Sequence, residues 1–113
     1  MTQKAYHSFV QFQKECFPNK ILERLEDKLQ IGMMTKTRLE KNEDNPKTGT
    51  LAVREPFSSG KTLTSKVQHF YMCEGFTVIQ DTETSLQVTK EDEKYSVGIY
   101  PHDLHYIIRI GVS

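Results

Sequence analysis

Residues 76–112 read FTVIQDTETSLQVTKEDEKYSVGIYPHDLHYIIRIGV. Within this stretch apolar side chains fall on alternate positions of several short segments, which is the period of strands with one buried face. The segments run from about Phe76 to Gln80, Ser85 to Lys90, Lys94 to Tyr100 and Leu104 to Val112. Acidic or proline-containing turns separate them, so we expect a mainly antiparallel meander.

The last of these segments has a second face that Ile107 makes partly apolar. A strand with apolar residues on both faces is more often central in a sheet than peripheral. Before the meander, Leu63 to Glu74 repeats apolar residues every three or four positions and ends at Gly75. We expect this helix to pack on the even-numbered face of the last strand, with that strand inside the sheet.

Two helical patterns open the chain. The first runs from about Thr2 to Phe17, where Pro18 interrupts it, and the second from Ile21 to Leu29. Asn19 can cap the second run and Gly32 can end it. The sequence leaves open whether these are two helices or one helix kinked at the proline.

Between the helical patterns, residues 33–57 alternate as a hairpin around a polar loop at positions 42–49. Pro56 indicates that the second strand ends there or lies at an edge of the sheet. The predicted fold class is α+β: N-terminal helices, a β-hairpin, a central helix, then a mainly antiparallel C-terminal β-meander, with helix packed on sheet. The order of the other strands is not determined by the pattern.

Length and composition indicate one soluble domain spanning residues 1–113. Hydrophobic residues make up 36% and charged residues 27% of the chain, near the globular norm. No signal-peptide run and no stretch of eighteen apolar residues occurs, which predicts a cytoplasmic protein without a membrane partner. Cys16 and Cys73 lie far apart among helical apolar residues, so we expect buried, reduced thiols.

Charge is balanced overall, with 15 basic and 15 acidic residues, but unevenly distributed. Residues 34–66 contain seven basic and four acidic side chains, whereas residues 67–113 contain three basic and seven acidic ones. This bipolar distribution differs from the basic excess that a general nucleic-acid binder usually carries over its whole domain.

The hairpin supplies the clearest candidate for a binding surface. If Thr37 pairs with Val53, then Lys36 lies opposite Arg54, with Arg38 nearby. Like charges opposed across a ladder are unfavourable unless an anion lies between them. We therefore expect an anionic partner, either nucleic acid or acidic protein, or else a solvated polar face. The candidate partner-binding residues are Lys36, Arg38, Arg54, Lys61, Lys66, and the acidic knob Glu91, Asp92 and Glu93 at a hairpin tip.

One segment, Ser58 to Thr62, ends like a phosphate-binding loop, in which backbone amides surround phosphates and a lysine neutralises charge. Glu55 occupies the position of the glycine that this motif requires, and no strongly apolar strand leads into it. An ordinary glycine-containing linker is the favoured interpretation.

Histidines provide two further candidates. His102 and His105 could hold a metal with Asp103, but no spacing identifies a third and fourth ligand, from His7, His69 or elsewhere. His69 and Cys73 lie one helical turn apart, where a thiolate could be activated. Neither pattern is specific, and we expect no catalytic residue, metal ion or cofactor.

The sequence thus favours a small non-catalytic binding protein that acts through protein–protein contacts. Inhibitors and adaptors, including those of mobile genetic elements, fit this description by analogy. The alternative is an RNA- or DNA-binding module that uses the basic hairpin. A wide apolar stripe at Phe9, Val10, Phe12 and Phe17 leaves a homodimer and a monomer as equal alternatives.

Overall fold

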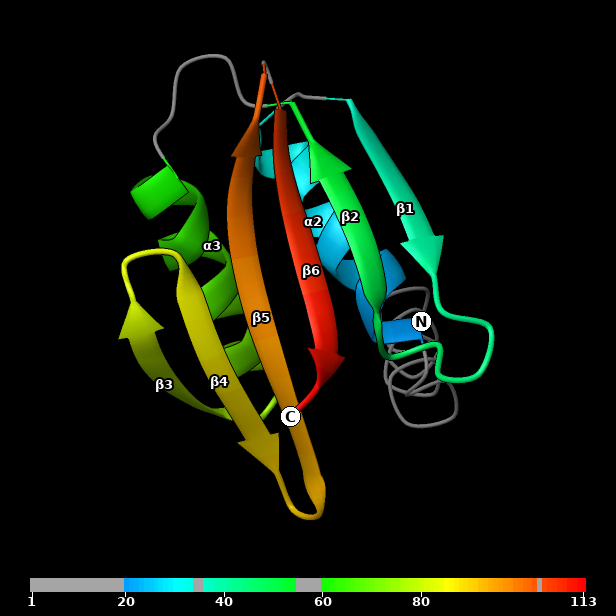
Figure 1. Cartoon of the computed structure of the whole chain (residues 1–113), viewed down its shortest axis with the longest axis vertical. Coiled ribbons are helices and arrows are strands. Elements are labelled where there is room, and N and C mark those ends of the chain that lie inside the picture. Colours follow the sequence, from blue (N-terminus) through cyan, green and yellow to red (C-terminus); the bar gives the residue numbers. More distant parts are fainter. Residues whose placement is uncertain (1–19, 34–35, 55–59, 104) are drawn as a thin grey trace, which may run out of the picture.

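The computed structural model describes residues 20–33, 36–54, 60–103 and 105–113. Six strands in these ranges form one antiparallel sheet in the order β1-β2-β6-β5-β4-β3 (Figure 1). The elements are α2 (Ile21–Met33), β1 (Thr37–Lys41), β2 (Gly49–Val53), α3 (Gly60–Cys73), β3 (Thr77–Thr82), β4 (Ser85–Lys90), β5 (Glu93–His102) and β6 (His105–Val112).

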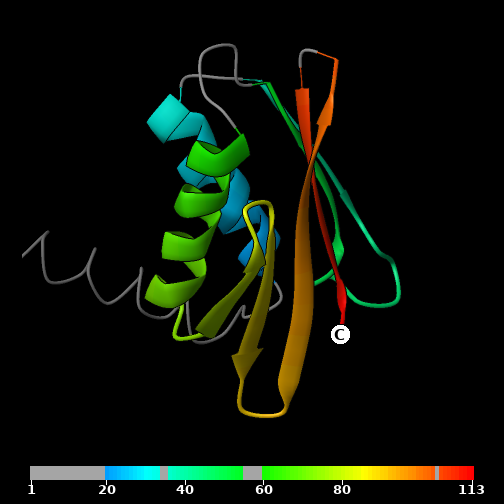
Figure 2. The same ribbon diagram turned by 60° about the vertical axis from the view of Figure 1, so that its left-hand side comes forward.

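Both described helices lie on the same face of this sheet (Figure 2). Helix α2 contacts β1 and β2, whereas α3 contacts β3, β4 and β5. The order of elements in the structure, helix, hairpin, helix and meander, confirms the predicted α+β class. The first predicted helix, Thr2 to Phe17, and the apolar stripe within it lie outside the described residues, so the homodimer stays a prediction.

Strand β6 lies in the interior of the sheet, between β2 and β5, as its two-sided apolar pattern predicted. Its even-numbered residues Ile108 and Ile110 are buried beneath the helices, while His105 and Arg109 are exposed. In helix α3, Leu63 and the residues that follow it at helical spacing belong to the same core. The even-numbered face of β6 is therefore the covered face, as expected.

The end of helix α3 has a Schellman motif. The amide of Gly75 donates to the carbonyl of Met72 at 3.1 Å, and the amide of Phe76 donates to the carbonyl of Tyr71 at 3.0 Å. Gly75 has φ +92°, which favours glycine, and the rings of Tyr71 and Phe76 meet edge to face. The motif turns the chain from the helix into β3.

The hairpin has the register on which the binding-surface argument depended: Thr37 pairs with Val53, and Leu39 with Leu51. Strand β2 ends at Val53 and lies between β1 and β6, so the alternative of a second strand at the sheet edge is wrong. The edge position was predicted without knowledge of β6, which pairs with β2 although the two strands are more than fifty residues apart in the sequence.

The prediction of a buried thiol is wrong for Cys73, which is free and exposed. The buried stripe of α3 runs through Leu63, Val67 and Tyr71, whereas His69 and Cys73 follow the outward side of the helix. Cys16 lies outside the described residues. Neither described helix combines the length and the apolarity that crossing a bilayer requires.

Candidate functional site

The face of the sheet opposite the helices carries no element of the described chain, and we call it the open face (Figure 2). Register places one row of side chains across it as Arg38, Ala52, Ile107 and Tyr100, on four neighbouring strands. Ala52 and Ile107 are half-buried and Tyr100 is exposed. The open face therefore has a partly apolar centre bordered by charge.

Basic and imidazole side chains gather at one end of the open face, which we call the basic end. The amide of Arg54 donates to the carbonyl of Lys36 at 3.1 Å, which places these two cations side by side across β1 and β2. His102 and His105 pair with each other at the same end, where β5 passes into β6. The basic end comprises Lys36, Arg38, Arg54, His102 and His105.

Among the described residues, the acidic groups at the basic end are Glu40 and the exposed Asp103 in the turn after His102. The guanidinium of Arg38 pairs with Glu40 at 3.0 Å, but both side chains are largely exposed, and such a pair contributes less than about 1 kcal/mol. Glu55, which follows Arg54 in the sequence, lies outside the described residues. Within the ranges that the structure describes, the three cations Lys36, Arg38 and Arg54 outnumber these acidic groups, so an anionic ligand is favoured at this end.

A hollow of about 310 Å³ lies within the basic end. Ala52 and Ile107 supply apolar lining. Lys36, Arg38, His102 and His105 line it with nitrogen donors, together with Thr37. Three separate parts of the chain thus place donors around one apolar surface.

Beside this hollow, Tyr100 forms an exposed aromatic surface. A Cβ added to Gly98 would lie 2.5 Å from the hydroxyl oxygen and 2.8 Å from a ring carbon of Tyr100, so the ring lies across the glycine. The guanidinium of Arg109 lies 5.8 Å from the ring centroid, within cation–π range. Gly98 allows the aromatic ring to lie flat on the sheet beside a cation.

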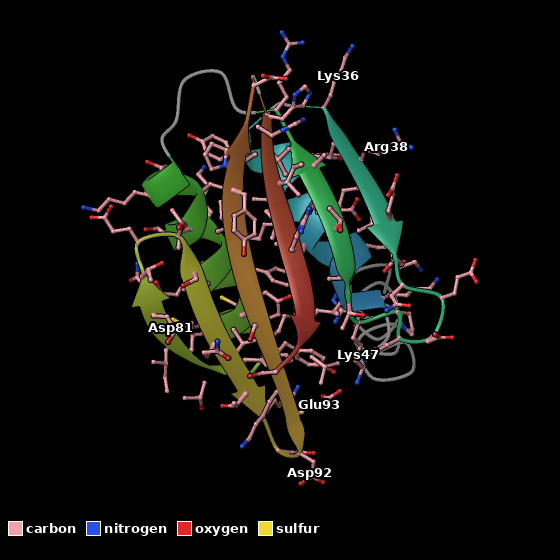
Figure 3. All side chains as sticks on the ribbon, in the orientation of Figure 1. Lys36, Arg38, Lys47, Asp81, Asp92 and Glu93 are labelled. Atoms are coloured by element: carbon pink, nitrogen blue, oxygen red, sulfur yellow. The ribbon has the colours of Figure 1, made fainter. Side chains whose placement is uncertain are left out.

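The structure does not bring all the predicted residues together. Lys61 and Lys66 belong to α3, on the covered side of the sheet, and so are separated from the open face. Glu91 and Asp92 form the turn between β4 and β5; Asp92 lies at the opposite end of the molecule from Lys36 (Figure 3). The basic and acidic groups are therefore the two ends of one elongated domain.

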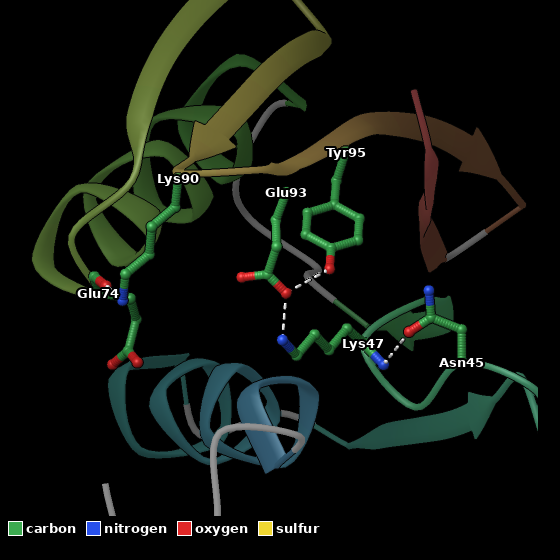
Figure 4. A network of polar contacts seen from close by, with 6 residues as sticks. All are labelled: Asn45, Lys47, Glu74, Lys90, Glu93 and Tyr95. Carbon is green, nitrogen blue, oxygen red and sulfur yellow. Dashed lines mark hydrogen bonds and ion pairs between the residues drawn. The ribbon is translucent and has the colours of Figure 1, made fainter. Parts of the chain in front are cut away.

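Glu93 differs from the other two acidic residues because its carboxylate already has partners within the chain (Figure 4). Lys47 forms an ion pair and a hydrogen bond with it, and the Tyr95 hydroxyl donates to it at 2.9 Å. Burial opposes ionisation, but the hydrogen bonds from Lys47 and Tyr95, with the charges of Lys47 and Lys90, outweigh it and lower the pKa of Glu93. This network connects the β1–β2 loop to the start of β5.

The same network acts on Tyr95. Its burial, together with the hydrogen bond to Glu93 and the charge of that carboxylate, raises the pKa of Tyr95 to about 12. The loop is also ordered from within, because the amide of Lys47 donates to the side chain of Asn45 at 3.1 Å. Glu93 is thus engaged in structure, which leaves Glu91 and Asp92 as the exposed part of the acidic end.

Glu93→Gln is expected to reduce stability at pH 7 by about 1 kcal/mol or less, since it removes a partly exposed ion pair. The pKa of Glu93 is lowered by folding, so its contribution is complete above the ordinary pKa of a glutamate and is lost as pH falls through the lowered value. Urea unfolding of both proteins at pH 7 and pH 3 should therefore show a difference that narrows at the acid pH. Glu91→Gln, at an exposed position, is the control and should change stability little at either pH.

The alternative chemistries have less support from geometry. The Cys73 sulfur lies 3.5 Å from Nε2 of His69, but the pair is exposed on the outer side of α3. Within the part of the chain that the structure describes, no three His, Cys, Asp or Glu side chains gather to hold a metal ion. The segment that resembles a phosphate loop, 58–62, lies largely outside the described residues.

Sequence reasoning missed Tyr100 and Arg109 as members of the binding surface and considered His102 and His105 only as metal ligands. Alternation along the last strand already placed His105, Ile107 and Arg109 on one side. What it could not provide was the pairing of β6 with β2, which brings these residues beside the hairpin.

No family model, no curated protein and no solved structure matches this chain.

Proposed function

We propose that this protein is a small cytosolic binding domain without catalysis of its own, of the inhibitor or adaptor type, and that its open face docks on an acidic surface of another protein. The observation that carries the proposal is the basic end, where Lys36, Arg38 and Arg54 border the apolar centre of a sheet face that no described element covers. Cations around an apolar centre suit a protein partner with carboxylates around an apolar contact.

Charge segregation supports the same proposal. Lys90 and Lys94 flank the exposed acids Glu91 and Asp92 at the far end of the domain, so among the described residues the excess of positive charge is found at the basic end. Such a distribution orients an approaching partner and disfavours wrong orientations more than it adds affinity. A chain without net charge gains specificity in this way without attracting every polyanion.

Affinity capture from extract of the native cell tests the proposal with two matched variants. Lys36→Glu/Arg54→Glu should reduce the captured partner by about tenfold or more, because two cations at the contact become anions. Lys61→Glu/Lys66→Glu changes the net charge equally on the covered side and should leave capture unchanged.

Nuclease treatment is the second arm of this experiment. Capture that survives nuclease and depends on Lys36 and Arg54 supports a protein partner. Equal loss with both variants, or no loss with either, would contradict docking through the basic end.

A second candidate, single-stranded RNA or DNA binding, is favoured by the Tyr100 ring that lies flat across Gly98 beside Arg109. Exposed aromatic rings on a sheet, flanked by cations, stack nucleobases in many such domains. This candidate predicts capture that nuclease abolishes and that weakens steeply with salt. Tyr100→Leu should then cost about 1 to 3 kcal/mol of binding free energy.

A further inference from the structure

The hollow at the basic end has a chemistry more specific than general attraction for acidic surfaces. Its nitrogen-bearing residues come from three separate places. Lys36 directly precedes β1 and Arg38 lies in β1, His102 ends β5, and His105 begins β6. Together they offer ammonium, guanidinium and imidazole donors around one volume of about 310 Å³.

A phosphoryl group suits this donor set better than a carboxylate does. A phosphorylated side chain carries close to two negative charges and three strong acceptor oxygens, so several donors from different directions can be satisfied at once. A carboxylate has two oxygens in one plane, and a single arginine can engage both. Four donor groups around one hollow exceed what one carboxylate requires.

The apolar lining of the hollow indicates what carries the phosphoryl group. Ala52 and Ile107 are half-buried and lie side by side on β2 and β6. Beyond Ile107 the same row continues to the exposed ring of Tyr100. This surface can contact the carbon atoms of a side chain whose phosphate faces the donors, whereas inorganic phosphate would leave it uncovered.

We infer that this hollow binds the phosphoryl group of a phosphorylated side chain on the partner protein. The inference rests on the proposed function and adds a condition to it: phosphorylation of the partner strengthens docking. In the described part of the chain, the nearby acidic groups are Glu40, which pairs with Arg38, and the exposed Asp103 in the turn after His102. Neither residue lines the hollow.

Nuclear magnetic resonance titration of the isotope-labelled full chain with phenyl phosphate tests the inference. We expect saturable shifts at Ala52, Ile107 and both histidine rings, with a dissociation constant on the order of 1 mM. Benzoate, inorganic phosphate and tetrathymidylate are the comparison ligands. Binding of phenyl phosphate tighter than that of all three supports a phosphorylated side chain.

Three results would overturn it: no saturable shift at the hollow, equal affinity for benzoate, or tighter binding of tetrathymidylate, which would assign the hollow to nucleic acid. Lys36→Ala/Arg38→Ala should weaken phenyl phosphate by about tenfold, and Lys61→Ala/Lys66→Ala should not weaken it. If phenyl phosphate does not bind as expected but the partner is still captured through the basic end, the phosphoryl inference alone is removed. If neither phenyl phosphate binding nor capture through the basic end is observed, the proposed function is removed as well.

Discussion

Ile108→Ala is expected to lower the free energy of unfolding by about 4 kcal/mol, the upper part of the range for a large-to-small core change. Ile108 is fully buried at the centre of β6, against Leu51 of β2 and Ile99 of β5. Ile107→Ala is the matched control because the neighbouring residue faces the open side and is only half-buried.

Ile107→Ala should lower the free energy of unfolding by only about 1 kcal/mol, because folding removes less apolar surface from water at this half-buried position. Urea unfolding of both variants beside the wild type measures the difference. Equal losses for the two positions would mean that the face occupied by Ile107 is covered as fully as the face occupied by Ile108, and would contradict an open face.

Gly49→Ala is expected to cost about 3 kcal/mol of stability because the new methyl group has no room. A Cβ at this position would lie 2.4 Å from the backbone oxygen of Glu40 and 2.9 Å from Cα of Lys41. Both contacts are with backbone of the paired strand, so no flexible side chain can move aside. The first strand pair would have to separate or shift.

Gly111→Ala provides the control within the same sheet, since a Cβ there meets no atom within 4 Å. We expect a change of no more than about 0.5 kcal/mol. Thermal unfolding of the two alanine variants distinguishes the cases. A Gly49 variant as stable as the Gly111 variant would show that β1 and β2 approach less closely than described.

Local pattern predicted most of the fold because the four inner strands, β2, β6, β5 and β4, each bury one face. Alternation identified every strand of the meander, and apolar residues on both faces of β6 predicted its interior position, which the structure confirms. Helical spacing located α3, and Gly75 predicted its end, where a residue with positive φ is required. These features depend on neighbours in sequence.

Features that depend on the pairing of strands far apart in the sequence could not be predicted from local pattern. The pairing of β2 with β6 determines that the hairpin cations and the histidine turn share one end of the open face. Sequence proximity instead grouped Lys61 and Lys66 with Lys36, although α3 lies on the other side of the sheet. For Cys73, flanking apolar residues were misleading because Met72 beside it is itself exposed.

Site-specific photocrosslinking in native extract tests most directly whether the open face is the binding face. A benzophenone amino acid is placed at Tyr100 on the open face or at Met72 on α3, whose side chains are similarly exposed, at 53% and 57%. If the open face is the binding face, one dominant protein is crosslinked from position 100 and none from position 72. Crosslinking of that protein from position 72 with none from position 100 would contradict it.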